Sequence, residues 1–181
     1  MSKSTKWRES SFLGVPFRSF CDPASESDVR QAETLLGGKL PEDFREFLTT
    51  VNCAMTSDVD EFELAHIPLP QSTVCLGTIA GLPPPGGSGT SIVAASHILR
   101  SREPEDGPLP IDSVFLASQD NDWDLVLTFG PRRHGEVWMK AWELLDAEDN
   151  YDNLIGDPEC HFYPIADSFS KLIRMLKRPS M

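Results

Sequence analysis

The sequence lacks the features that mark membrane, secreted or zinc-binding proteins. No uncharged apolar stretch approaches the roughly 20 residues that a membrane-spanning helix needs, and the opening residues, MSKSTKWRESS, are too polar for a signal peptide. The four cysteines have no CxxC spacing, so we expect reduced and mostly buried thiols rather than a zinc site or a disulfide framework; they are Cys21, Cys53, Cys75 and Cys160. These absences favour a folded cytoplasmic protein without membrane contact.

Sequence patterns of catalysis are also missing. Neither GxSxG nor GxxxxGK[ST] occurs, and the glycine-rich GGSGTS at 86–91 has no lysine. DNDWD at 120–124 resembles the start of a calcium loop, but Leu125 and Pro131 stand where that loop needs glycine and glutamate. The four histidines have no HxH or HxxxH spacing; they are His66, His97, His134 and His161. We predict a non-enzymatic chain with no catalytic residue, metal or cofactor, and an enzyme built on these histidines is the minor alternative.

Acidic residues are abundant, and one segment carries the imbalance. The formal net charge is −12, and residues 103–159 hold 15 acidic against 3 basic residues. Such a field repels nucleic acid and attracts a basic protein partner, although a solvated face that only maintains solubility is the other interpretation. The predicted partner-binding residues are nine of the acids, all from residue 120 onward, and two aromatic residues among them: Asp120, Asp122, Trp123, Asp124, Asp146, Glu148, Asp149, Tyr151, Asp152, Asp157 and Glu159.

Three segments carry helix patterns. In PASESDVRQAETLLGG, Ser25 and Asp28 have capping spacing, and a Gly-Gly pair ends the helix. In LPEDFREFL, Pro41 fits the first helical position, acids fill the first turn, and Asn52 is a stop signal. The third helix lies in PIADSFSKLIRMLKR, where Asp167 or Ser168 can cap.

Between the second and third helices, the pattern favours strands. Val, Ile, Phe and Trp are enriched in segments separated by Gly, Pro, Asp and Asn; the segments are ELAHI, TVCLGTI, SIVAASHIL, DSVFLAS, WDLVLTF and GEVWMKAW. SIVAASHIL could equally be helical, and the Pro- and Gly-rich segments 81–90 and 102–110 are loops. We predict a single α+β domain over 25–178, preceded by an irregular extension over 1–24. It has a mainly antiparallel sheet of about five or six strands, packed against two N-terminal helices and a C-terminal helix.

The order of these motifs resembles the SUKH superfamily. The resemblance rests on GGKLPEDFREFLTTVN, then FLASQDNDWDLVLTF and GEVWMKAWE, then IADSFSKLIRML, and it covers roughly residues 25–178. Members often have Asn-Gly-Gly after the second helix, whereas here Asn52 precedes Cys53 and Ala54. The family's Gly-Asp before a central strand appears as Trp123-Asp124.

The superfamily includes bacterial immunity proteins of polymorphic toxin systems and fungal cell-wall synthesis regulators. The resemblance therefore implies a protein that neutralises a cognate toxin by binding it. The acidic segment further suggests a basic toxin, such as a nuclease, whose active face must hold phosphates. The alternative is a host regulatory scaffold that binds several protein partners through its Pro-rich loops.

Overall fold

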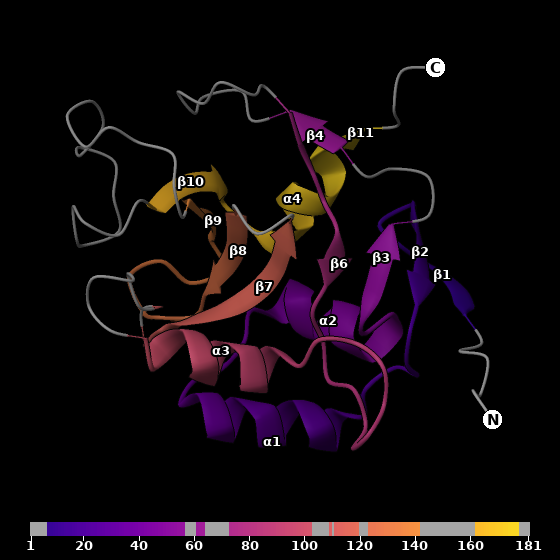
Figure 1. The fold of residues 1–181 in the computed structure, drawn as a ribbon, viewed down its shortest axis with the longest axis horizontal. Helices are drawn as coiled ribbons and strands as arrows, with labels where there is room; N and C mark the ends of the chain where they lie inside the picture. The colour runs from indigo at the N-terminus through magenta and orange to yellow at the C-terminus, as the bar shows by residue number, and fades with distance from the viewer. Residues whose placement is uncertain are drawn as a thin grey trace.

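An eight-stranded sheet runs through the middle of the molecule. The computed structural model describes residues 7–56, 61–63, 73–102, 109, 111–119, 123–141 and 162–177. The strand order is β1-β2-β3-β6-β7-β8-β9-β10, every neighbouring pair is antiparallel, and the sheet is drawn from right to left in Figure 1. Its strands are β1 (Arg8–Phe12), β2 (Val15–Ser19), β3 (Ala54–Thr56), β6 (Thr78–Ile79), β7 (Ser113–Gln119), β8 (Trp123–Thr128), β9 (Val137–Ala141) and β10 (Phe162–Ala166).

A smaller sheet and four helices complete the described fold. The three-stranded sheet has the order β11-β4-β5, from β11 (Leu176–Lys177), β4 (Glu61–Glu63) and β5 (Thr73–Cys75). The helices are α1 (Glu26–Leu36), α2 (Glu42–Thr50), α3 (Ile92–Arg100) and α4 (Phe169–Met175). Helices α1 and α3 lie side by side at one end of the molecule, and α2 packs against α4 (Figure 1). The predicted α+β class with an antiparallel sheet is confirmed, with a wider sheet than expected.

The first helix forms as its sequence pattern predicts. The Ser25 hydroxyl accepts a hydrogen bond from the Asp28 N–H at 3.2 Å, and the Asp28 carboxylate accepts one from the Ser25 N–H at 2.9 Å. This capping box satisfies backbone donors that have no partner in the first turn. Val29, Ala32 and Leu36 are buried, and Gly37 ends the helix with a φ of 85°.

Helix α2 contributes two phenylalanine rings to an aromatic core. Pro41 is the N-cap rather than the first helical residue, and its carbonyl accepts the N–H of Arg45 at 2.9 Å. Phe44 and Phe47 point inward, and the Phe47 ring meets Phe12, Phe17 and Phe169 at centroid distances of 5.5, 5.5 and 5.1 Å. Edge-to-face packing of this kind adds to the burial energy of the rings. The aromatic cluster therefore joins α2 and α4 to the β1–β2 hairpin.

The structure differs from the sequence-based expectation at the N-terminus. Residues 8–19, expected to be irregular, form a hairpin that starts the large sheet, with Phe12 and Phe17 in the core. The sequence signal for these two strands is weak because RESSF and VPFRS contain few apolar residues and VPFRS contains a proline. Leu13 and Gly14 make the turn, both with positive φ.

Other boundaries also differ from the expectation. SIVAASHIL, counted among the strand candidates, forms α3, because Ser91 caps the Ala94 N–H and a buried stripe recurs at Ile92, Ser96 and Leu99. Strands β3 and β10 were not anticipated, and α4 ends at Met175 because Leu176 and Lys177 pair with β4. ELAHI lies outside the described residues except for Glu63. No helix in the described ranges is long and apolar enough to span a bilayer.

Candidate functional site

The structure describes two of the eleven predicted contact residues. Trp123 and Asp124 open strand β8, whereas the others, all within 120–122 and 146–159, lie outside the described residues. Asp124 is only 6% exposed and stands opposite Lys140 of β9 in the strand register. Asp124 therefore offers little surface to a partner, and the acidic contact surface as a whole stays a prediction.

A cluster of charged and aromatic groups surrounds Trp138 on β9. The Trp138 ring is 5% exposed, its Nε1 donates to a Glu136 carboxylate oxygen at 3.0 Å, and the Arg133 guanidinium lies 4.6 Å from the ring centroid. An aromatic ring covered by a cation and anchored by its N–H is held rigidly. Trp138 is therefore a core residue of the large sheet and not an exposed binding anchor.

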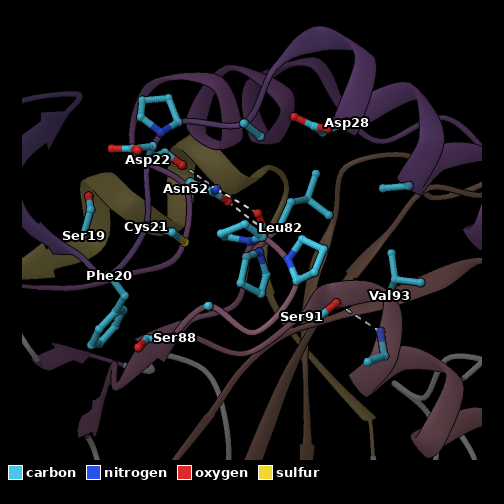
Figure 2. Close-up of a pocket in the computed structure, with 18 of the residues that line it drawn as sticks. Ser19, Phe20, Cys21, Asp22, Asp28, Asn52, Leu82, Ser88, Ser91 and Val93 are labelled. Atoms are coloured by element: carbon cyan, nitrogen blue, oxygen red, sulfur yellow. Dashed lines mark hydrogen bonds between the residues drawn. The ribbon is translucent and has the colours of Figure 1, made fainter. Parts of the chain in front are cut away.

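Elsewhere in the fold, a pocket of about 800 Å³ lies between three segments of the chain. Its walls are the segment 19–24 after β2, the exposed side of α1, and the Pro-rich loop that leads into α3 (Figure 2). This volume is in the range of pockets that hold small molecules or the side chains of a partner protein. It is the site that the described geometry supports best.

Asn52 holds two of the three walls in place, the segment after β2 and the Pro-rich loop. Its Nδ2 donates to the carbonyl oxygens of Asp22 at 2.8 Å and of Leu82 at 3.1 Å, and its Oδ1 accepts the Leu82 N–H at 2.7 Å. Asn52 is 1% exposed and has a φ of 70°, a left-handed conformation that Asn adopts more easily than most residues. Asn52, the stop signal after α2, thus also fixes two loops through its side-chain hydrogen bonds.

The Pro-rich loop closes the pocket from the side opposite α1. Its first residue, Gly81, bonds twice to the far end of the loop: its N–H donates to Thr90 O at 2.9 Å, and its carbonyl accepts the Ile92 N–H at 2.9 Å. A turn follows, in which the Gly87 N–H donates to Pro84 O at 2.8 Å. Pro84 and Pro85 are exposed at the pocket rim. The segment that the sequence marked only as a loop therefore has fixed attachments.

Polar groups of both signs line the pocket. Arg8 donates through Nη2 to the carbonyl oxygens of Thr50 and Val51, at 3.2 and 3.1 Å, which fixes its guanidinium beside the C-terminus of α2. Asp22 and Asp28 are exposed, and the hydrogen bonds from Ser25 hold the pKa of Asp28 below its usual value. Because the lining mixes apolar and charged groups, it can hold an amphipathic group but has no constellation of nucleophile and base.

Two cysteines lie close together, and one of them lines the pocket. Cys21 is half-buried and lines it, whereas Cys53 is fully buried. The Phe20 N–H donates to Cys53 O at 2.8 Å, which extends the β2–β3 pairing and brings the two thiols within hydrogen-bonding reach. A hydrogen bond from Cys53 lowers the pKa of Cys21 to about 7 against the opposing effect of burial, with a smaller contribution from Arg8.

The same hydrogen bond, together with burial, raises the pKa of the Cys53 thiol. The Cys53 sulfur also lies 3.8 Å from Asn52 Oδ1, but that oxygen already accepts the Leu82 N–H. Cys53 therefore keeps its proton and shares it with Cys21. Sequence reasoning missed this pair because the two residues are 32 positions apart and only the β2–β3 pairing, which it did not anticipate, brings them together.

Among the described residues, no group of three His, Cys, Asp or Glu side chains could hold a metal ion. Of the four histidines, the structure describes His97 and His134. His97 is exposed on α3, and His134 bonds to Phe129 O through Nδ1 at 3.0 Å.

The comparison with protein families places the chain. The model of the SMI1 / KNR4 family (SUKH-1) matches residues 23–175, which includes α1, α2, α3, α4 and the large sheet from β3 onward. The chain belongs to this family. The β1–β2 hairpin precedes the matched span, although it pairs with β3 in the same sheet. No curated protein matches the sequence.

Proposed function

We propose that this chain is a cytoplasmic, non-enzymatic immunity protein that binds and neutralises a cognate bacterial toxin. The observation that carries the proposal is the family match over residues 23–175, because the SUKH superfamily is rich in such immunity proteins. Neutralisation by binding needs no catalytic group, only a surface that covers the working face of the toxin. A specific protein interface buries about 1,200 to 2,000 Å² in total.

Charge supports the choice of a basic toxin as partner. Residues 103–159 hold 15 acidic and 3 basic residues, and this segment includes the predicted contact residues. A basic toxin face, such as that of a nuclease, would be drawn to this segment by long-range attraction, which raises the association rate at low salt. The acid-rich parts of the segment are the proposed contact surface, and the nearly buried Asp124 adds to the negative charge without touching the partner.

Growth of bacteria that express the toxin domain encoded beside this gene tests the proposal. Co-expression of this chain should restore growth, and a tagged copy should retain the toxin in a pull-down after a wash at moderate salt. A matched control uses an unrelated acidic protein of similar size and charge. If growth is not restored and no complex forms, the immunity function is wrong.

The exposed prolines favour a second candidate function, a regulatory scaffold with several protein partners. Pro84 and Pro85 stand at the rim of a pocket beside Phe20, and prolines of fixed conformation lose little entropy on binding. Crosslinking in cells followed by identification of partners separates the two candidates. One stoichiometric toxin partner supports immunity, whereas several weaker partners that Pro84→Ala and Pro85→Ala both release support the scaffold.

A further inference from the structure

The pocket wall holds one of two neighbouring thiols that have opposite properties. Cys21 is accessible at the pocket wall, and Cys53 is buried directly behind it. Figure 2 shows Cys21 in the segment after β2, beside Asn52. A reagent in the pocket can reach Cys21 without any opening of the fold.

The surroundings of Cys53 leave no room for an added group. A Cβ placed on Gly81 would lie 2.9 Å from the Cys53 sulfur, and one placed on Gly89 would lie 3.0 Å from it. Gly89 has a φ of 110°, which side-chain-bearing residues rarely adopt. The backbone of the Pro-rich loop therefore lies close against the Cys53 sulfur. The neighbouring sulfur of Cys21 is the group with which Cys53 can react.

We propose that Cys21 and Cys53 form a thiol–disulfide exchange pair, in which Cys21 attacks a small soluble disulfide in the pocket and Cys53 completes an intramolecular disulfide. This reactivity goes beyond toxin binding and does not depend on it. Solvent access decides the roles of the two thiols. The accessible Cys21 reacts with the reagent, and the buried Cys53 reacts only with Cys21.

The reaction proceeds in two balanced steps. The Cys21 thiolate attacks one sulfur of the small disulfide, a mixed disulfide forms, and the other half leaves as a thiolate that takes up a proton. The Cys53 thiol then loses its proton and attacks the Cys21 sulfur, which releases the second half as a thiol. The protein loses two electrons and two protons, and the small disulfide gains both, so that two small thiols are produced.

Ionisation of the two thiols suits this order. With a pKa of about 7, about half of Cys21 is thiolate at neutral pH, whereas an ordinary cysteine with a pKa near 8.5 is a few per cent ionised. The negative charge on Cys21 is one of the causes that raise the pKa of Cys53. Cys21 carries no negative charge once it is bound in a mixed disulfide. Cys53 then loses its proton more easily than it does in the resting pair, which favours the second step.

The test is a titration of the full chain with oxidised glutathione, followed by intact mass and by peptide mapping without reduction. We expect a transient glutathione adduct on Cys21, then a protein two hydrogens lighter with a Cys21–Cys53 link, and full reversal by reduced glutathione. The Cys53→Ser variant should stop at the Cys21 adduct. In the Cys21→Ser variant, Cys53 should stay unmodified until denaturant is added.

A second readout keeps the proposal falsifiable if a variant folds poorly. The rate at which the wild-type Cys21 reacts should rise with pH with a midpoint near 7, and Cys53→Ala should shift the midpoint toward that of an ordinary thiol. The proposal is overturned if native wild-type protein gives no Cys21–Cys53 link, if Cys53 reacts before Cys21, or if the midpoint lies near 8.5.

Discussion

Asn52 and Leu82 are joined by a reciprocal pair of hydrogen bonds, in which the Leu82 N–H donates to Asn52 Oδ1 at 2.7 Å and Asn52 Nδ2 donates to Leu82 O at 3.1 Å. This pairing mimics one rung of a β-ladder and binds the Pro-rich loop to the end of α2. Nδ2 also reaches Asp22 O. One side chain thus replaces backbone pairing for two loops.

Replacement of Asn52 should therefore destabilise the fold and loosen the pocket. Asn52→Ala removes three buried hydrogen bonds, and we expect a loss of about 3 kcal/mol in the free energy of unfolding, measured with urea. Asn52→Gly loses the same bonds but tolerates the φ of 70°, so it should be about 1 kcal/mol more stable than the alanine variant. Equal stability of the two variants would contradict a strained backbone at this position.

The buried carboxylate Glu33 joins α1 to the start of α2. Its Oε1 accepts the Leu40 N–H at 2.9 Å and Arg45 Nη1 at 2.9 Å, and its side chain is 9% exposed. Glu33→Ala should cost about 2 to 3 kcal/mol, because the buried Leu40 N–H loses its acceptor and the partly buried Arg45 loses one of its carboxylate partners. The control, Glu9→Ala, breaks an exposed pair with Arg18 and should cost less than about 0.5 kcal/mol. Similar losses in the two variants would show that burial of the Glu33 pair adds nothing.

The N-terminal hairpin should be an integral part of the core. Phe17 is fully buried and its ring meets Phe47 at a centroid distance of 5.5 Å. We expect Phe17→Ala to cost about 3 to 5 kcal/mol in denaturant unfolding, as for other large-to-small core changes. Phe17→Leu, which keeps most of the volume, serves as the control and should lose clearly less. A Phe17→Ala variant with wild-type stability would mean that the hairpin does not pack as described.

The capping box at Ser25 should give the fold a specific sensitivity to acid. The hydrogen bonds from Ser25 hold the pKa of Asp28 below its usual value, so ionised Asp28 stabilises the fold above the unfolded-state pKa. That stabilisation is lost as the pH falls below about 4 through the folded-state pKa. Asp28→Asn should therefore be less stable than wild type at pH 7, with the difference shrinking toward pH 2. A difference that does not depend on pH would rule out the carboxylate as the cause.

Neutralisation of the acidic segment should weaken toxin binding without unfolding the chain. We expect Asp149→Asn combined with Asp152→Asn to lower affinity by about three- to tenfold at low salt and to reduce its salt dependence, as measured by titration calorimetry. The matched control, Glu42→Gln with Glu46→Gln, makes the same change in net charge at exposed positions on α2. If the two pairs have the same effect, net charge matters and the proposed surface does not.

Local signals predicted the helices well because the relevant physics is local. The Ser25–Asp28 cap, the stop at Gly37 and the acidic first turn of α2 each act within a few residues, and all three appear in the structure as expected. Strands β7, β8 and β9 were also found, since long runs of buried β-branched and aromatic residues leave few alternatives. The family resemblance, carried by the same motifs, is confirmed.

Features that depend on distant partners could not be predicted in this way. The short strand β3 gains its pairing from β2 and β6, which lie far away in sequence, and the weakly apolar β1 and β2 are held by Phe47 and Phe169. In the pocket, one asparagine connects residues around 20, 52 and 82. The cysteine pair forms where the same segments of the chain come together. A helix-stop asparagine gives no local sign that its side chain holds two loops.

Immunity by binding can be measured by titrating the purified toxin domain with this chain while toxin activity and complex formation are recorded in the same samples. We expect activity to fall to zero at a stoichiometric ratio as a saturable complex forms, and affinity to decrease as salt is added. Full toxin activity in the presence of excess chain, with no complex at any salt concentration, would contradict immunity by binding.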